Sequence, residues 1–447
     1  MSLPPPYYND DEKSFAFSTV RQRWPKIIET AIADVQSAIQ DHEEHAHLGD
    51  RIVNQLLQLN EDFANDAIVQ PFTASEIQIN PDLKHYNESL EKLNQDKKVT
   101  WRTGPWLYLE CYLYQYINNF FIIDTDPFWK EFDVFGRLKT QTFKQSESGV
   151  LELCKRYEVL SSQLGKADSE TLFLLFKEFI DISLWGNATD LSLLAGNVSL
   201  EDIKSVQGAE VRKKNEEKIL VNDISQAWKE LIGDNNRVDI VLDNSGFELF
   251  TDLILVLFLL DAKIVNEVHL HCKEIPWFVS DTMPKDFQDL LSQLVDTKFY
   301  PEIHAKDPKA IKLVHDELQN YYKNYQLIIN HDPFWTLDYN YWSIPKFTKL
   351  YDELKKSNLI IFKGDLNYRK LTGDLEWPTT TPFKTAIQDL ATSGLPILSL
   401  RTCKADVVVG LPEGVNEKLI KEYENMGNQN GRLWSSSGKW AVISFNK

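Results

Sequence analysis

Two residues with metal-binding chemistry follow a short β-branched run near the middle of the chain. The run Val238–Leu242 leads directly into Asp243 and Asn244, and a long apolar segment, Leu249–Leu260, begins soon afterwards. This order predicts a strand, a turn and a helix, and ligands bind at the carboxyl ends of strands in open α/β sheets. Hard divalent cations prefer carboxylate and amide oxygens. The pair therefore indicates half of a metal site, although Asx residues before a helix also act as caps or turn formers.

Three further strand-like runs lead into residues suited to hold a cation or an anion. These junctions are Trp277–Ser280 into Asp281, Leu359–Phe362 into Lys363–Lys370, and Ile397–Leu400 into Arg401–Lys404. Acidic or amide side chains occur at three of the four predicted strand ends, and basic side chains occur at two of them. The combination suggests a divalent metal beside an anionic group, whereas each segment alone is explained as well by an ordinary turn or by solvated basic residues.

The predicted metal half of the site consists of Asp243, Asn244 and Asp281. Two carboxylates and one amide would leave a bound cation strongly Lewis acidic and would leave positions for water and substrate. Asp281 is followed by Thr-Met-Pro, which is also the composition of a helix start. Its assignment therefore depends on its two companions.

The predicted anion half lies on the two later strand ends. Gly364 permits a close backbone approach, and Asp365 and Asn367 can orient hydroxyl groups or water. Arg401 and Lys404 can hold phosphate oxygens, arginine through its planar fork and lysine as a point charge.

The composition limits the class of protein and its partners. The chain has 447 residues, 43% of them apolar and 12% aromatic, so it can bury large cores. A net charge of −18 argues against nucleic-acid binding or an anionic membrane surface, but it permits a small anionic substrate. Four scattered cysteines, no signal-peptide pattern and apolar runs too short to cross a bilayer predict an intracellular location, in the cytoplasm or nucleus.

The pattern of apolar residues changes near residue 235. Before it, apolar periodicity predicts helices from Trp24 onward and at 106–121, 151–164 and 172–184, with a charged connection at 208–218. After it, short β-branched runs alternate with helices, at 238–242, 265–271, 359–362, 397–400 and 407–409, with 441–445 as a late edge strand. We predict an α/β fold with a mainly helical N-terminal domain, 1–235, and an α/β/α sandwich with a Rossmann-like sheet and the metal site, 236–447.

A set of short motifs is specific when taken together. The motifs are Arg23-Trp24-Pro25, Gly104–Leu107, Glu110–Tyr112, Leu184–Asn187, Thr189–Ser192, Leu242–Glu248, Trp277–Thr282, Lys363–Leu371 and Arg401-Thr402-x-Lys404. They resemble the metal-dependent damage-control phosphatases, in the subgroup also called acidic residue methyltransferase, for which an R-T-x-K run is a signature. The resemblance extends through most of the chain.

This resemblance implies a fold, an activity and a set of site residues. The fold is a helical N-terminal part followed by an α/β/α part. The metal would lie on Asp243, Asn244 and Asp281, which with Asp365 are the predicted catalytic residues. The predicted substrate contacts are Glu248, Gly364, Asp365, Leu366, Asn367, Tyr368, Lys404 and Arg401. The implied activity is hydrolysis of small phosphate esters, such as fructose 1-phosphate and fructose 6-phosphate, with Mn, Co, Ni or Mg; carboxyl methylation with S-adenosylmethionine is also implied.

Three functional hypotheses follow, and the oligomeric state stays open. The first is a metal-dependent phosphomonoesterase for a small phosphorylated metabolite, in which Arg401 either adds charge or braces its loop. Its nucleophile is a water activated by the cation or a carboxylate such as Asp365. The second is an S-adenosylmethionine-dependent protein glutamate carboxyl methyltransferase, which the lack of a Gly-rich turn after any predicted strand disfavours. The third is a catalytically silent binding protein.

Overall fold

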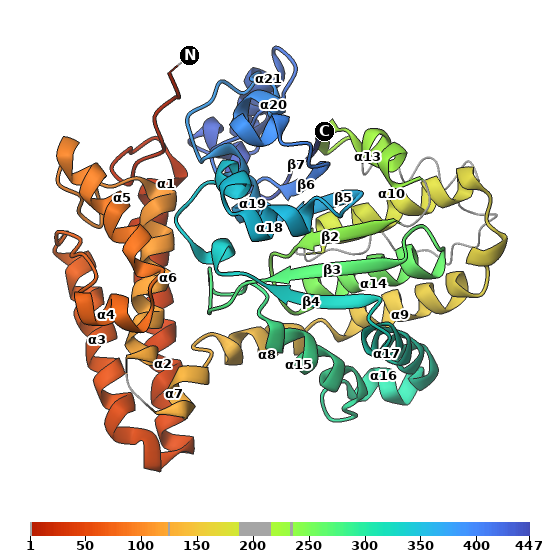
Figure 1. Ribbon diagram of the computed structural model, residues 1–447, viewed down its shortest axis with the longest axis horizontal. Helices are drawn as coiled ribbons and strands as arrows, with labels where there is room; N and C mark the ends of the chain where they lie inside the picture. Colours follow the sequence, from red (N-terminus) through yellow and green to blue (C-terminus); the bar gives the residue numbers. More distant parts are fainter. Residues whose placement is uncertain (1, 124–125, 187–215, 233–235) are drawn as a thin grey trace.

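The computed structural model describes residues 2–123, 126–186, 216–232 and 236–447 (Figure 1). The predicted connection at 208–218 lies mostly outside these residues, and motif residues 187–192 lie outside them. A helical N-terminal part stands beside a larger part built on a central sheet, and Figure 1 shows α8 (Gly136–Lys144) running from one to the other.

The N-terminal helices form where the helical patterns are strongest. Pro25 occupies the first turn of α2, where its missing N–H costs nothing, and the predicted stripe of Ile28, Ala31 and Val35 is buried. Almost every residue of α6 is buried, which explains its apolar character all round. These helices are α1 (Phe15–Ser18), α2 (Trp24–Asp41), α3 (Ala46–Ala64), α4 (Ala74–Ile79), α5 (Leu83–Asp96), α6 (Trp106–Ile122) and α7 (Pro127–Glu131).

The helices of the second part surround the sheet. Those at 151–164 and 172–184 are confirmed as α9 and α10. In the described part of the chain, no helix is long and apolar enough to cross a membrane. The helices are α9 (Glu147–Ser161), α10 (Ser169–Trp185), α13 (Ile224–Leu231), α14 (Phe247–Asp261), α15 (Pro284–Val295), α16 (Pro301–Lys306), α17 (Pro308–Lys323), α18 (Thr348–Leu354), α19 (Gly364–Thr372), α20 (Phe383–Ala386) and α21 (Val415–Asn425).

The described residues contain one mixed sheet with the strand order β1-β7-β6-β5-β2-β3-β4. Neighbouring strands are parallel except for β6 and β7. The strands are β1 (Ile219–Asn222), β2 (Arg237–Val241), β3 (Glu267–Cys272), β4 (Leu327–His331), β5 (Leu359–Lys363), β6 (Ile397–Thr402) and β7 (Ala441–Asn446).

The strand order places a topological switch point between β2 and β5. From β2 the chain continues outward through β3 and β4, and it then returns to form β5 on the opposite side of β2. Val241 pairs with Phe362 near the ends of the two strands. The carboxyl ends of β2 and β5 therefore lie side by side, at the position where open α/β sheets bind ligands.

Alternate residues of each strand face two different cores, which confirms the predicted α/β/α arrangement. In β2, Val238 and Ile240 belong to a core that also contains α9, α10, α14 and α17. Val241 and, in β5, Phe362 belong to the second core, together with α6, α18 and α19. Because both faces are covered, every residue of β2 and β5 is buried.

The segment Trp277–Ser280 is a turn, so its prediction as a strand is wrong. Strand β3 ends at Cys272, and Phe278 and Val279 have positive φ angles of 44° and 71°. Asp281 still reaches the end of β2, because it forms an isolated β-bridge with Asn244.

The remaining strand predictions are confirmed in part. The valines at 407–409 are buried but lie in a loop, where the Tyr368 hydroxyl accepts a hydrogen bond from the Val409 N–H at 3.0 Å. The strand at 441–445 exists as β7, but it lies between β1 and β6 and is not an edge strand. The edge strands of the sheet are β1 and β4. The sequence pattern did not predict them, because both are short and mix apolar with polar residues.

A buried arginine connects the helical part to the sheet part. Arg369 of α19 donates to Glu110 of α6 at 2.8 Å and to Asp374 at 3.1 and 3.0 Å, and its guanidinium stacks on Trp106. The predicted boundary near 235 stays a prediction, although α9, α10 and β1 before it pack into the same core as the sheet.

Replacing Glu110 with glutamine should destabilise the protein without unfolding it. The substitution removes one of two carboxylates from a buried arginine, and breaking a buried pair costs about 3 kcal/mol or more. We expect a loss of about that size in the free energy of unfolding, measured by urea denaturation. The exposed Glu376→Gln is the control and should change stability by less than about 0.5 kcal/mol.

Candidate functional site

Backbone hydrogen bonds join the two segments that carry the predicted metal ligands. The Thr282 N–H donates to the Asp243 carbonyl at 2.8 Å, and the Ser245 N–H donates to the Ser280 carbonyl at 2.7 Å. Asp243 is 9% exposed and Asp281 is 1% exposed. The structure therefore brings together the segments that carry the three residues predicted from two separate strand ends.

The side-chain amide of Asn244 has a fixed orientation. Its Nδ2 donates to Asp243 Oδ2 at 2.9 Å and to Glu248 Oε2 at 2.8 Å, while the Ser280 hydroxyl donates to its Oδ1. An amide oxygen cannot donate a hydrogen bond, so the nitrogen is the amide atom that donates to both acids. The amide oxygen consequently faces Ser280 and keeps a second lone pair.

Two buried lysines accompany these acids. Lys273 lies 3.2 Å from Asp281 Oδ2 and donates to the Leu242 carbonyl at 2.8 Å. Lys363, the last residue of β5, is 1% exposed and contacts Asp252 at 2.8 Å and Glu248 at 3.3 Å. The interpretation of Lys363 as part of a solvated basic cluster is therefore wrong, because its ammonium is enclosed by acids.

Gly364 packs directly against Asp243, just beyond the ends of β5 and β2. Its φ is +81°, and a Cβ atom at this position would lie 1.8 Å from Asp243 Oδ2. Only glycine combines this left-handed backbone with such a close approach. The predicted reason for a glycine here is confirmed, and the partner that approaches it is a predicted metal ligand.

The buried charges at this site do not balance. Four carboxylates, on Asp243, Glu248, Asp252 and Asp281, face the ammonium groups of Lys273 and Lys363, so full ionisation leaves two negative charges.

The pKa values reflect this imbalance. Burial raises the pKa of Asp243 well above its usual range, and the carboxylates of Glu248 and Asp281 raise it further, against the opposing effect of Lys273. Burial also raises the pKa of Asp281 to about 6, although Lys273 opposes it. The protein alone therefore disfavours ionised carboxylates here, and a bound divalent cation would favour them. Among the described residues, no three His, Cys, Asp or Glu form a complete metal cage, so the set depends on the Asn244 amide.

Arg401 and Asp365 form a buried brace under the loop that carries Lys404. Arg401 Nε and the Lys404 N–H both donate to Asp365 Oδ1, at 2.8 and 2.9 Å. The guanidinium also binds the Ala405 and Val407 carbonyls and stacks on Tyr368 at 4.2 Å. Arg401 is fully buried, so its contacts support the bracing role.

Lys404 differs from the other cations of the site. It is only half-buried, and no acidic side chain of the described residues lies within ion-pair distance of its ammonium. Its charge nevertheless lowers the pKa of Asp243, which places it near the metal half.

The side chains of Leu366, Asn367 and Tyr368 point into the protein. Asn367 Nδ2 donates to the Lys363 carbonyl at 2.7 Å and to the Val241 carbonyl at 3.1 Å, so it ties β5 to β2. In the first turn of α19 only the N–H groups up to residue 366 lack an intrahelical acceptor, so of these three residues only Leu366 could offer a backbone N–H to a ligand.

Comparison with known proteins identifies the family. Residues 19–419 match the family described as the damage-control phosphatase ARMT1-like domain. The chain belongs to this family. It is 34% identical to damage-control phosphatase ARMT1 of Macaca fascicularis and of Homo sapiens, over 99% of this chain and 98% of each relative, and 33% identical to that of Xenopus laevis, over 97% of both chains. A crystal structure of a DUF89 family protein from Pyrococcus horikoshii has 16% identity and a TM-score of 0.35, covering 83% of this chain and 93% of that one.

The sequence patterns of this ARMT1-like chain do not predict Lys273 or Asp252 as part of the site, and they do not show that Lys363 pairs with buried acids. A signal exists, because Asp252 interrupts an apolar helix, Lys273 directly follows a buried strand and Lys363 is the last residue of another. A charged residue in such a position needs a buried partner, but the sequence does not show which one.

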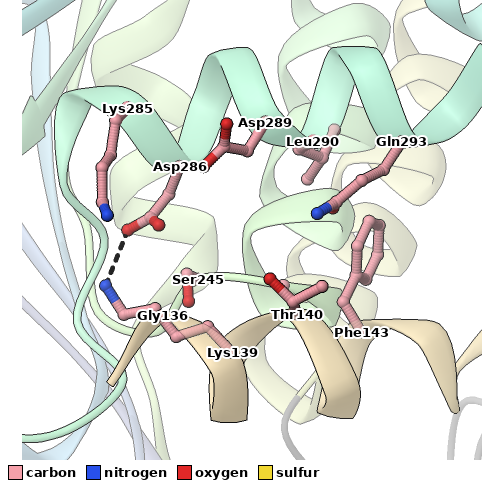
Figure 2. A pocket seen from close by; sticks show the side chains of 11 residues that line it. Gly136, Lys139, Thr140, Phe143, Ser245, Lys285, Asp286, Asp289, Leu290 and Gln293 are labelled. Carbon is pink, nitrogen blue, oxygen red and sulfur yellow. Dashed lines mark hydrogen bonds and ion pairs between the residues drawn. The ribbon is translucent and has the colours of Figure 1, made fainter. Parts of the chain in front are cut away.

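A separate pocket of about 210 Å³ lies between α8 and α15, next to the turn that follows Asn244 (Figure 2). Its wall includes Ser245 and Gly246, but none of the predicted site residues lines it. Figure 2 shows Lys139 reaching Asp286, and this buried ammonium also pairs with Asp133. Because Lys139 is already neutralised, we interpret this cluster as a connection between the two helices.

Replacing Gly364 with alanine should impair the ARMT1-like site more than it impairs the fold. The added Cβ would displace Asp243, and a shift of about 1 Å in a catalytic site costs about 100-fold in activity. We expect a loss of that size in phosphate release, measured beside the melting temperature.

Gly394→Ala is the matched control, because Gly394 has a φ of +78° and no atom would lie within 4 Å of its Cβ. It carries the same backbone strain without the steric clash, so its melting temperature should fall by no more than that of Gly364→Ala while it keeps the parent activity. Equal activity in the two variants would contradict the close-approach role of Gly364.

Proposed function

We propose that this protein is a metal-dependent phosphatase that hydrolyses small phosphate esters. The observation that carries the proposal is the meeting of two unlike halves at Gly364: uncompensated carboxylates at the end of β2, and the N-terminus of α19 beside Lys404. Membership of the damage-control phosphatase family supports the same activity. A phosphatase needs both halves, because it must hold a cation and a phosphate next to each other.

Asp243, Asp281 and the Asn244 amide oxygen would hold the cation. Their fit to a divalent ion rests on the two excess negative charges and on the free lone pair of Asn244 Oδ1. When bound, the cation supplies Lewis acidity and neutralises charge on the phosphate. We propose Mn, Co, Ni or Mg for this role.

The phosphate would lie between Lys404 and the first turn of α19. That turn presents N–H groups without intrahelical partners, and the helix dipole favours an anion there. Lys404 adds a positive charge close to the metal half. Together these groups would orient the ester and stabilise charge on the transferring phosphoryl group.

Asp365 and Arg401 would position this cradle. Two hydrogen bonds converge on Asp365 Oδ1, one of them from the Lys404 backbone, so the carboxylate fixes the loop beside α19. These contacts favour a water molecule over Asp365 as the nucleophile.

The substrate that we propose is a sugar phosphate such as fructose 1-phosphate or fructose 6-phosphate. All four cysteines are buried and unpaired, which supports our proposal that the protein works in the reducing cytoplasm or nucleus. No described feature favours the methyltransferase alternative with S-adenosylmethionine, and we do not propose it.

Asp243→Ala should abolish metal binding without damaging the fold. It removes a charged ligand, so we expect phosphate release with Mn and fructose 1-phosphate to fall by several orders of magnitude. The metal-free variant should melt at or above the parent temperature, because it loses a crowded buried charge. Calorimetric titration with Mn tests the metal assignment, and parent-like Mn binding in the variant would show that this assignment is wrong. A panel of phosphate esters, assayed beside labelled S-adenosylmethionine, tests whether the parent releases phosphate or transfers methyl groups.

Lys404→Ala should weaken phosphate binding while leaving metal affinity unchanged. A charge-assisted hydrogen bond contributes roughly 1.5–3 kcal/mol, so kcat/KM should fall by about tenfold or more. The exposed Lys418→Ala is the matched control and should behave like the parent. Full catalytic efficiency in Lys404→Ala would place this lysine outside the site.

A further inference from the structure

A chain of buried contacts extends from the predicted metal ligand Asn244 into the core. Asn244 donates to Glu248, Lys363 contacts the other oxygen of Glu248, and Lys363 also donates to Asp252 and to the Ser183 carbonyl, at 2.8 and 2.7 Å. The Ser183 hydroxyl in turn donates to Asp252 at 2.6 Å. Three helices, α10, α14 and α19, and strand β5 thus meet at one ammonium group.

We propose that Glu248 is a positioning residue for Asn244, held in place by Lys363, and that it does not touch the substrate. This inference rests on the proposed function, because it concerns a ligand of the proposed metal. Glu248 is 6% exposed, and each of its carboxylate oxygens already has a partner: Oε2 accepts from Asn244 and Oε1 faces Lys363 at 3.3 Å. A substrate hydroxyl would have to displace one of these partners.

The orientation of the amide explains why this position matters. An asparagine binds a cation through its oxygen, and a flipped amide would present the nitrogen. Glu248 and Asp243 both accept from Nδ2, while Ser280 marks the oxygen side. Asp243 alone cannot serve as an anchor, because it would also hold the metal. Glu248 is therefore the fixed acceptor that decides which end of the amide faces the cation.

Lys363 connects this orientation to the phosphate half. It directly precedes Gly364, so the residue that fixes Glu248 also fixes the start of α19. Its contacts with Asp252 and Ser183 attach it to α14 and α10, which lie on one face of the sheet. This buried ion cluster therefore fixes the start of α19 relative to Glu248.

Glu248→Gln tests the proposal, because a glutamine cannot accept from Asn244 and from Lys363 with both of its terminal atoms. Loss of an outer hydrogen-bond partner of a metal ligand typically costs 10–100-fold in affinity. We expect Mn to bind 10–100-fold more weakly by calorimetry, while KM for fructose 1-phosphate at saturating Mn stays within about twofold of the parent. Glu248→Asp, which keeps the charge, should recover part of the Mn affinity.

Glu110→Gln is the matched control, because Glu110 is also buried and paired with a cation but does not contact Asn244. This variant should be less stable than the parent and should bind Mn with the parent affinity. A raised KM in Glu248→Gln with parent Mn affinity would show that Glu248 contacts substrate and would overturn the inference. Equal Mn affinity and equal KM would overturn it as well. If the parent binds Mn and releases phosphate in these assays, either result leaves the proposed function intact; a parent that does neither refutes both.

Discussion

An excess of buried negative charge at the end of β2 is the constraint on which the rest of the site depends. Carboxylates taken out of water are costly unless they are paired, and here two lysines serve four acids. The surrounding fold must hold these groups together against their repulsion. It does so with a strand paired on both sides and with backbone hydrogen bonds from the Thr282 turn. The site is thus organised to favour a cation that the protein does not itself supply.

The same constraint explains the sharp junction between β5 and α19. The helix begins directly after the last strand residue, and Gly364 lets it start against Asp243 with no intervening side chain. The carboxylate of Asp243, after β2, therefore lies directly against Gly364, the first residue of α19, where the helix dipole is positive. A longer loop or any side chain at this position would separate the two halves and weaken their combined action on one phosphate.

Much of this arrangement could be predicted from the sequence, because parallel strands place their ends at one edge of a sheet. Asp243 and Gly364 follow strands that exist as predicted, and the switch point brings them together. Asp281 was predicted at the end of a strand that does not exist, and it reaches the site from a turn. The positive φ angles of that turn, at Phe278 and Val279, are rare for such residues and leave no pattern in the sequence. The partners of Lys273 and Lys363 depend on packing between distant elements, which local periodicity does not encode.

The helical N-terminal part takes on a role that the charge arrangement makes necessary. Helix α19 would carry the proposed phosphate end of the site at its N-terminus, and its other end is anchored by Arg369 to Glu110 of α6. Lys370, one residue further, donates to the Leu337 carbonyl at 2.8 Å and fixes the same end to the chain that follows β4. A helix whose first turn must face crowded carboxylates cannot be left to shift along its axis. The N-terminal helices therefore act as the fixed support against which the position of α19, and with it the spacing of the two halves, is held.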